Sequence, residues 1–155
     1  MKSDVKIDGD RLQLTRTFAA PRELVFAWWT SAEKMQQWSS CKEATGCWIT
    51  MDFRVGGKFT NTMEIHGSKH TMVGTFQEIK VPEKIVYTAD LGPMVSTVPT
   101  VTIEFFDLGK STKVVLTHVG LPNEFIQKNV AQGTDESFDK LDVIIASQAS
   151  PTQNA

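Results

Sequence analysis

Few side chains in this 155-residue sequence are of the types that carry out chemistry, and they are widely spaced. Tyr87 and His118 both fall among alternating apolar residues, which predicts strands with these two side chains on a buried face. A buried imidazole can transfer a proton, or it can be a core side chain bonded to a nearby carbonyl. The tyrosine hydroxyl can orient a ligand or reach solvent. These two residues are the candidate proton-transfer groups if the protein is an enzyme.

Other polar residues give weaker indications of a site. Asn61 can orient a ligand, and Arg54, which precedes two glycines, can bind a carboxylate or pair with a local acid at a turn. His66 and His70 are four residues apart, but the G-S-K between them indicates a turn, so the helical zinc geometry does not apply. No nucleophile elbow, phosphate loop or dinucleotide fingerprint is present. The sequence therefore predicts no catalytic residue, no metal and no cofactor.

Cys41 and Cys47 are the only cysteines, with no second pair and no histidine at metal-ligand spacing beside them. We expect thiols, because a reducing compartment disfavours disulfides. A bend that joins the two as a disulfide stays open as an alternative.

Charge and hydropathy exclude two classes of partner. Sixteen basic and eighteen acidic side chains give a formal net charge of -2, without a basic run that would attract nucleic acid. The apolar runs are too short for a membrane span, which needs about 20 residues. The first residues are polar and show no export signal, so a cytoplasmic protein is expected. The length predicts a single domain over 1–155.

The chain reads in order as one strand, two short helices, a run of strands and one long helix. Residues 11–18 alternate, with Arg16 as a basic residue on the apolar face, and Pro21 and Ser31 each begin a short helix. Six further strands are predicted at 47–53, 58–65, 71–79, 85–89, 100–107 and 112–118.

Helical periodicity then extends over 124–147, where Gly133 and Thr134 interrupt the apolar pattern. The ordered core is expected over about 11–147, and the tail 149–155 is expected to fray. An antiparallel sheet with one buried face needs a cover, and this helix is the only element long enough to provide it. We therefore predict an α+β fold, with a curved antiparallel sheet of about six to seven strands around the C-terminal helix.

Several segments, in this order, carry a resemblance to a known family. They are R-T-F-A-A-P-R-E-L-V-F-A-W-W-T at 16–30, F-R-V-G-G-K-F at 53–59 and T-K-V-V-L-T-H-V-G at 112–120. The chain resembles the SRPBCC (START-like) superfamily, in the branch named for the activator of heat-shock-protein-90 ATPase, from Leu12 to about Ile145. The resemblance implies a helix-grip (START/Bet v-like) fold with a deep cavity for lipids, polyketides, sterols or other apolar ligands. In some members that cavity supports cyclase or dehydratase chemistry.

Two departures concern the mouth of that cavity. The family has Trp-Trp-Gly-Pro-like residues where this chain has Trp38-Ser39-Ser40-Cys41, and Gly-Trp near the start of the last helix where this chain has Gly133-Thr134. We therefore expect a remodelled mouth and do not transfer the family's ligands.

Alternation along the strands and the apolar faces of the helices give the candidate lining, which is mainly aromatic and aliphatic as small-molecule pockets are. The candidate ligand-binding residues are Trp28, Trp38, Phe59, Asn61, Met63, Met72, Phe76, Tyr87, Ile103, Phe105, Leu116, His118, Phe138 and Leu141.

Three hypotheses for function follow. The leading one is binding of a small, largely apolar ligand between the sheet and the last helix, where Met63 and Met72 adapt to its shape. The second is a polyketide cyclase- or dehydratase-like enzyme that uses His118 or Tyr87. The third, implied by the name of the branch, is a chaperone-associated protein-binding module. A homodimer is compatible with the fold, but no segment specifies one.

Overall fold

A computed structural model describes residues 2–93 and 95–149 of the protein and, at Ala149, the backbone alone. Its elements, in chain order, are β1 (Asp4–Asp8), β2 (Arg11–Phe18), α1 (Arg22–Ala27), α2 (Ala32–Gln36), β3 (Ala44–Met51), β4 (Lys58–Ile65), β5 (Ser68–Lys80), β6 (Lys84–Asp90), β7 (Thr100–Asp107), β8 (Thr112–Val119) and α3 (Glu124–Ala149).

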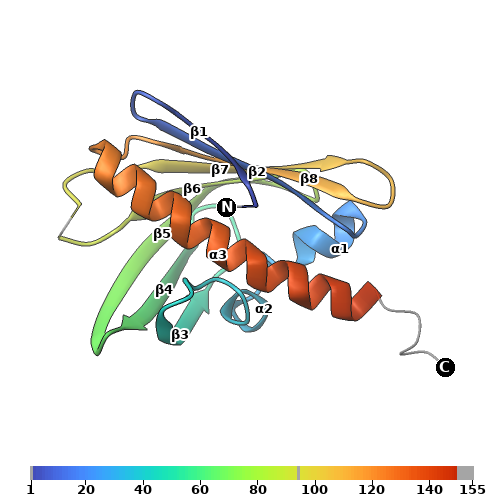
Figure 1. The fold of residues 1–155 in the computed structure, drawn as a ribbon, viewed down its shortest axis with the longest axis horizontal. Helices are drawn as coiled ribbons and strands as arrows, with labels where there is room; N and C mark the ends of the chain where they lie inside the picture. Colours follow the sequence, from blue (N-terminus) through green and yellow to red (C-terminus); the bar gives the residue numbers. More distant parts are fainter. Residues whose placement is uncertain (1, 94, 150–155) are drawn as a thin grey trace.

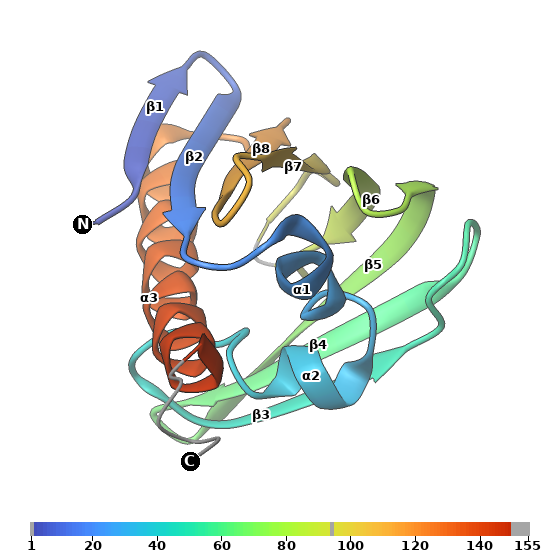
Figure 2. The ribbon, with the colours of Figure 1, turned by 90° about the vertical axis from the view of Figure 1, so that its right-hand side faces the viewer.

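One curved antiparallel sheet forms the body of the molecule, in the strand order β1-β2-β8-β7-β6-β5-β4-β3. Figure 1 shows α3 running diagonally across the sheet. In Figure 2, the sheet bends around α3, and α1 and α2 lie between its two ends. The predicted helix-grip fold is therefore confirmed.

The sheet has one strand more than the upper end of the prediction. The added strand is β1, which pairs with β2 at the edge of the sheet, where Val5 lies opposite Leu14 and Ile7 opposite Leu12. The segment D-V-K-I-D has only two apolar residues, so its sequence signal is weak. β1 lies before residue 11, where the ordered core was expected to begin.

Helix α3 continues through Gly133 without a break, although the apolar pattern is interrupted there. The Ser137 hydroxyl donates to the Gly133 carbonyl at 2.9 Å, and a Cβ at Gly133 would lie 3.8 Å from the Cβ of Cys41. At that distance a Cβ would make an ordinary van der Waals contact, so the packing leaves room for a larger side chain at this position. Residues 150–155 of the expected frayed tail lie outside the described residues. No helix of the described part is long and apolar enough to cross a membrane.

The two short helices form as predicted and cover one end of the sheet. The Ser31 hydroxyl caps α2 by accepting a hydrogen bond from the Lys34 backbone N–H at 3.2 Å. The indole Nε1 of Trp38 donates to the carbonyl of Trp28 at 3.0 Å, which joins the ends of the two helices. These bonds hold both tryptophans in the core.

Arg16 fastens α3 to the sheet. It lies on the inward face of β2, with its side chain 5% exposed, and donates to Asp135 at 2.6 Å, Asp139 at 2.9 Å and Asp142 at 2.7 Å. Its guanidinium also lies 5.7 Å from the centre of the Phe138 ring. Burial alone would raise the pKa of Asp135, but hydrogen bonds from Ser3 and the charge of Arg16 outweigh burial, so that this pKa lies below its usual value.

Candidate functional site

The layer between the sheet and α3 is fully packed at the end covered by α1 and α2. Phe138 of α3 meets Phe18 at 5.3 Å and Trp29 at 6.2 Å between ring centres. Trp29 in turn lies 4.6 Å from Trp38 and 5.0 Å from Phe105. All five rings are at least 97% buried. We call this end the packed half of the layer.

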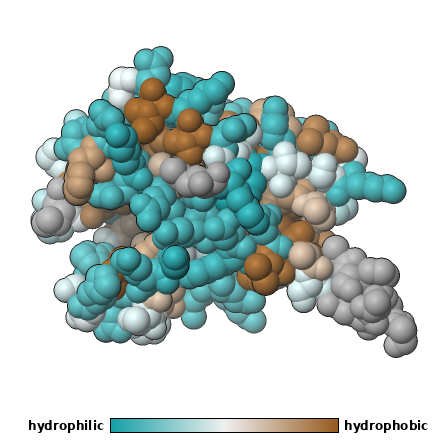
Figure 3. All heavy atoms as spheres, in the orientation of Figure 1, coloured by the Kyte–Doolittle hydropathy of each residue, from teal (hydrophilic) through white to brown (hydrophobic). Residues whose placement is uncertain are grey.

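The other end of the layer, beside the first turns of α3, is less filled. Its inward apolar side chains are only half-buried: Met63 on β4, Met72 on β5, Tyr87 on β6, Leu91 after β6 and Val130 on α3. Figure 3 shows the surface hollowed between the first half of α3 and the hairpin of β4 and β5. We call this end the open half of the layer, and it is the candidate site.

One cross-strand row brings the two chemical candidates of the open half onto the same face. Tyr87 pairs with Val101, and Val101 pairs with His118. Val101 is fully buried in the main core, which fixes this face as the inward one. Since neighbouring strands lie about 4.8 Å apart, the backbones of Tyr87 and His118 are roughly 10 Å apart. The two side chains therefore flank one valine at the floor of the layer.

His118 is 7% exposed and lies at the junction of two hydrophobic clusters. Its partners across the strands are Val101 of the main cluster and Leu12 of a smaller one that also contains Leu121 and Ala131. Its Nδ1 atom is buried and has no hydrogen-bond partner among the described residues. Burial lowers the pKa of His118 to about 4, so the ring is neutral at physiological pH.

Tyr87 presents its ring to the core of the sheet. The ring lies 4.8 Å from that of Phe59 and 6.3 Å from that of Phe76, both edge to face. Its hydroxyl forms no hydrogen bond within the described part of the chain. Burial raises the pKa of Tyr87 well above its usual value, so the phenol stays protonated.

Asn61, a third polar candidate, is engaged in the protein itself. Its amide nitrogen donates to the carbonyl of Ser39 at 2.9 Å and to the Ser39 hydroxyl at 3.1 Å, and its amide oxygen lies 3.6 Å from the sulfur of Cys47. Asn61 thus holds the loop after α2 against β4. Cys47 and Cys41 are free thiols, as expected, and burial raises the pKa of Cys47.

The structure divides the fourteen predicted lining residues between the two halves of the layer. Met63, Met72, Tyr87 and His118 lie in the open half, and Asn61 lies beside it. The other nine are buried within the main cluster, namely Trp28, Trp38, Phe59, Phe76, Ile103, Phe105, Leu116, Phe138 and Leu141.

The polar groups outside the layer have local partners. Arg54 pairs with Asp52 at 2.7 Å on an exposed turn, in line with the turn-pairing alternative. His66 lies 3.1 Å from Glu43, with both side chains exposed. Among the described residues no group of three or more potential ligands could hold a metal.

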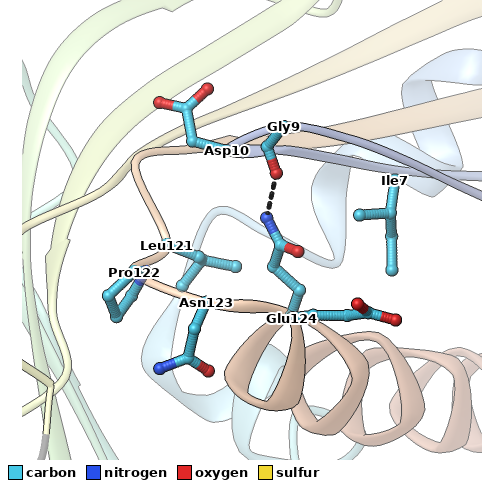
Figure 4. Close-up of a pocket in the computed structure, with 8 residues that line it drawn as sticks. Ile7, Gly9, Asp10, Leu121, Pro122, Asn123 and Glu124 are labelled. Carbon is cyan, nitrogen blue, oxygen red and sulfur yellow. Dashed lines mark hydrogen bonds between the residues drawn. The ribbon is translucent and has the colours of Figure 1, made fainter.

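Two depressions lie on the outer surface. The larger, of about 500 Å³, is bordered by the β1–β2 turn and the start of α3 and is drawn in Figure 4. Its Gln127 amide donates to the carbonyl of Gly9 at 2.7 Å, and its acidic side chains are Asp10 and Glu124. The smaller, of about 320 Å³, lies beside Arg16 and Asp142. Neither contains a predicted lining residue.

Comparison with known families agrees with this architecture. The sequence profile described as Activator of Hsp90 ATPase homolog 1-like protein (AHSA1) matches residues 19–146. The chain belongs to the AHSA1 family. No functionally curated protein matches it.

Solved structures similar to this AHSA1 chain share its fold at low identity. A protein of Arthrobacter aurescens is 17% identical, with a TM-score of 0.81 over 97% of this chain and 95% of that one. A protein of Chromobacterium violaceum is 22% identical, with a TM-score of 0.78 over 89% and 98%. The AHSA1 protein of Silicibacter pomeroyi is 20% identical, with a TM-score of 0.73 over 89% and 99%. At these identities the likeness concerns the fold alone.

Within this AHSA1 fold, sequence reasoning missed two residues of the open half. Leu91 lies just past the end of β6, in the irregular stretch before β7, where no periodicity indicates a direction. Val130 belongs to the predicted apolar set of α3, but helical periodicity does not distinguish a residue over the packed half from one over the open half. Both pack against the smaller cluster of Leu12, Leu14, Leu121 and Ala131.

Proposed function

We propose that this protein binds a small, largely apolar ligand in the open half of the layer between the sheet and α3. One observation carries the proposal: Met63, Met72 and Tyr87 point inward but are only half-buried at this end, whereas the five aromatic rings at the centre of the packed half are at least 97% buried. A ligand that covers Met63, Met72 and Tyr87 would gain about 25 cal/mol for each Å² of apolar surface removed from water.

The residue types of the open half suit such a ligand. Met63 and Met72 have flexible, polarizable side chains that adapt to different shapes. Leu91, just past β6, and Val130 of α3 provide aliphatic contacts and both pack against the smaller cluster. Among the described residues, the Tyr87 hydroxyl and the His118 ring stand beside them without partners in the protein. A few placed polar groups on an apolar wall are typical of small-molecule sites.

Binding accounts for these two residues better than proton transfer does. A general base works best with a pKa near the working pH, whereas that of His118 is lowered to about 4 by burial. The pKa of Tyr87 is raised by burial, so the phenol is a poor acid as well. Both groups are thus neutral hydrogen-bonding partners.

A fluorescence titration tests the proposal. N-phenyl-1-naphthylamine is a neutral, apolar dye whose emission rises when it leaves water, and we expect saturable binding to the wild-type protein. Replacement of Met72 by Trp would fill the open half and weaken binding at least about tenfold, equivalent to about 1.4 kcal/mol. The matched control is Val143→Trp, because Val143 is 70% exposed on α3.

Two results would contradict the proposal. One is the absence of a saturable signal in the wild type. The other is equal binding by the Met72→Trp and Val143→Trp variants, since the dye would then bind elsewhere. Thermal unfolding of both variants establishes that they are folded.

A further inference from the structure

We propose that the open half selects neutral ligands that carry a hydroxyl or carbonyl group over carboxylates of the same shape, with Tyr87 and His118 as the two hydrogen-bonding partners. This inference rests on the proposed function and specifies the chemistry of its ligand.

The geometry allows one ligand to reach both groups. Tyr87 and His118 lie on the inward face in one cross-strand row, on either side of Val101. Their backbones are roughly 10 Å apart, and both side chains project from the same face of the sheet. A molecule with a single ring or two fused rings can therefore span the space between the two side chains.

Both groups lack a partner in the protein itself. The Nδ1 atom of His118 is buried and unbonded, and the Tyr87 hydroxyl forms no hydrogen bond among the described residues. Buried polar groups are nearly always bonded, and each that is not costs stability. A ligand hydroxyl or carbonyl that bonds to the buried Nδ1 of His118 would remove this cost, and one that bonds to the Tyr87 hydroxyl would give it a partner that the protein does not provide.

The cations on the inward side are already engaged. Arg16 is held by three aspartates. Lys140 donates to the hydroxyl of Ser40 at 2.7 Å and to the carbonyl of Cys41 at 3.2 Å. His70 shares a row with Met63 but is exposed near the tip of β5.

A carboxylate in the open half would therefore be buried beside two neutral groups, with Arg16 and Lys140 already bonded to other residues. Burial of an unpaired charge is strongly unfavourable. The lowered pKa of His118 points the same way, because the ring remains uncharged at physiological pH and provides no positive charge. A neutral hydroxyl or carbonyl group does not meet this penalty.

Three matched probes test the inference near neutral pH: naphthalene, 2-naphthol and 2-naphthoate. They share one ring system and differ in having no polar group, a neutral hydroxyl group or a charged carboxylate. We expect naphthalene and 2-naphthol to bind, and 2-naphthol to bind at least about tenfold more tightly than 2-naphthoate.

Variants assign the preference to the two residues. Tyr87→Phe and His118→Leu are each expected to reduce the advantage of 2-naphthol over naphthalene by about threefold or more while naphthalene still binds. Thr88→Val is the control, because it removes a hydroxyl from the outer face of the same strand. Equilibrium unfolding of each variant shows that it is folded.

The outcomes separate the inference from the proposed function. If naphthalene and 2-naphthol bind but 2-naphthoate binds equally well, the inference is overturned and the proposed function stands. If the wild type binds 2-naphthoate tightly and Lys140→Met does not, Lys140 is the cation that pairs with the carboxylate, and the inference is overturned as well. If none of the probes binds, the proposed function falls and the inference with it.

Discussion

The packed and open halves of the layer lie under the same helix and on the same sheet, but they differ in how completely they are filled. In the packed half, α1 and α2 bring Trp28, Trp29 and Trp38 into contact with the core. The open half has the first turns of α3 above it and the half-buried Met63 and Met72 below. The comparison indicates that one half stabilises the fold and the other leaves room for a ligand.

The two halves also differ in the state of their polar groups. Arg16 in the packed half has three carboxylate partners, and the Trp38 indole has a carbonyl. In the open half, the His118 ring and the Tyr87 hydroxyl have none among the described residues. The Nε atom of Arg22 in α1 is also buried without a partner, so the contrast concerns these named groups and not every polar group of the packed half. Four predictions test this contrast, from the largest expected effect to the smallest.

The first prediction concerns Phe138, which is fully buried at the centre of the packed half. Phe138→Ala removes its contacts with Phe18 and Trp29 and leaves a cavity, so we expect the free energy of unfolding to fall by about 3–5 kcal/mol. Urea unfolding followed by tryptophan fluorescence measures the change. Phe125→Ala on the same helix is the control, because Phe125 is 74% exposed. Equal losses in the two variants would contradict a packed half centred on Phe138.

The second prediction concerns the attachment of α3 to the sheet. Arg16→Leu leaves three aspartates close together without their cation, and we expect the free energy of unfolding to fall by about 3 kcal/mol at neutral pH. Urea unfolding measures this change as well.

The matched control for Arg16 is Lys128→Met, which breaks the exposed pair of Lys128 with Glu124 on the same helix. Exposed pairs contribute between about 0 and 1 kcal/mol, so a small change is expected. If Arg16→Leu changed stability no more than Lys128→Met does, the aspartate cluster would not hold α3 in place.

The third prediction concerns acid stability in the open half. The pKa of His118 falls from 6.5 to about 4 on folding, so the unfolded chain binds the proton more tightly. The stability associated with the neutral ring is present above 6.5 and is lost as the pH falls toward 4. His118→Leu removes this dependence. As the pH falls from 6.5 toward 4, the free energy of unfolding of the variant relative to that of the wild type should therefore rise by up to about 3 kcal/mol.

Urea unfolding of the wild type and of His118→Leu at a series of pH values measures the difference directly. Subtraction of the two curves cancels titration of the other groups. His66→Leu is the control, because the His66 side chain is 77% exposed. A flat difference curve for His118→Leu would mean that the ring is not buried in its neutral form.

The fourth prediction is the smallest in energy. Tyr87→Phe removes a hydroxyl that has no partner among the described residues but keeps the ring contacts with Phe59 and Phe76. We expect the free energy of unfolding of the ligand-free protein to change by less than about 0.5 kcal/mol. Thermal unfolding without ligand measures it. A loss of more than about 1 kcal/mol would mean that the hydroxyl is bonded in the free protein, as a typical hydrogen bond contributes that much.

Alternation alone was enough to predict most strands and their inward faces. Phe59, Phe76 and Ile103 point inward as expected and are almost completely buried, because the side-chain period of a strand is fixed at two. The edge strand β1 was missed, since it depends on pairing with β2 and carries only two apolar residues. Alternation also gave Asn61 as a candidate ligand-binding residue, but it could not show that Ser39 lies within hydrogen-bonding reach of the amide.

Local periodicity encodes the order of the elements, the inward face of each strand and the presence of a covering helix, so all three could be predicted from the sequence. Which inward residues fill the core and which stay accessible is set by tertiary packing. That division depends on where α1, α2 and α3 lie over the curved sheet, and these contacts join residues far apart in the chain. The strand pattern does not distinguish Tyr87 and His118 from other inward residues. The packing around them leaves both without a hydrogen-bond partner among the described residues.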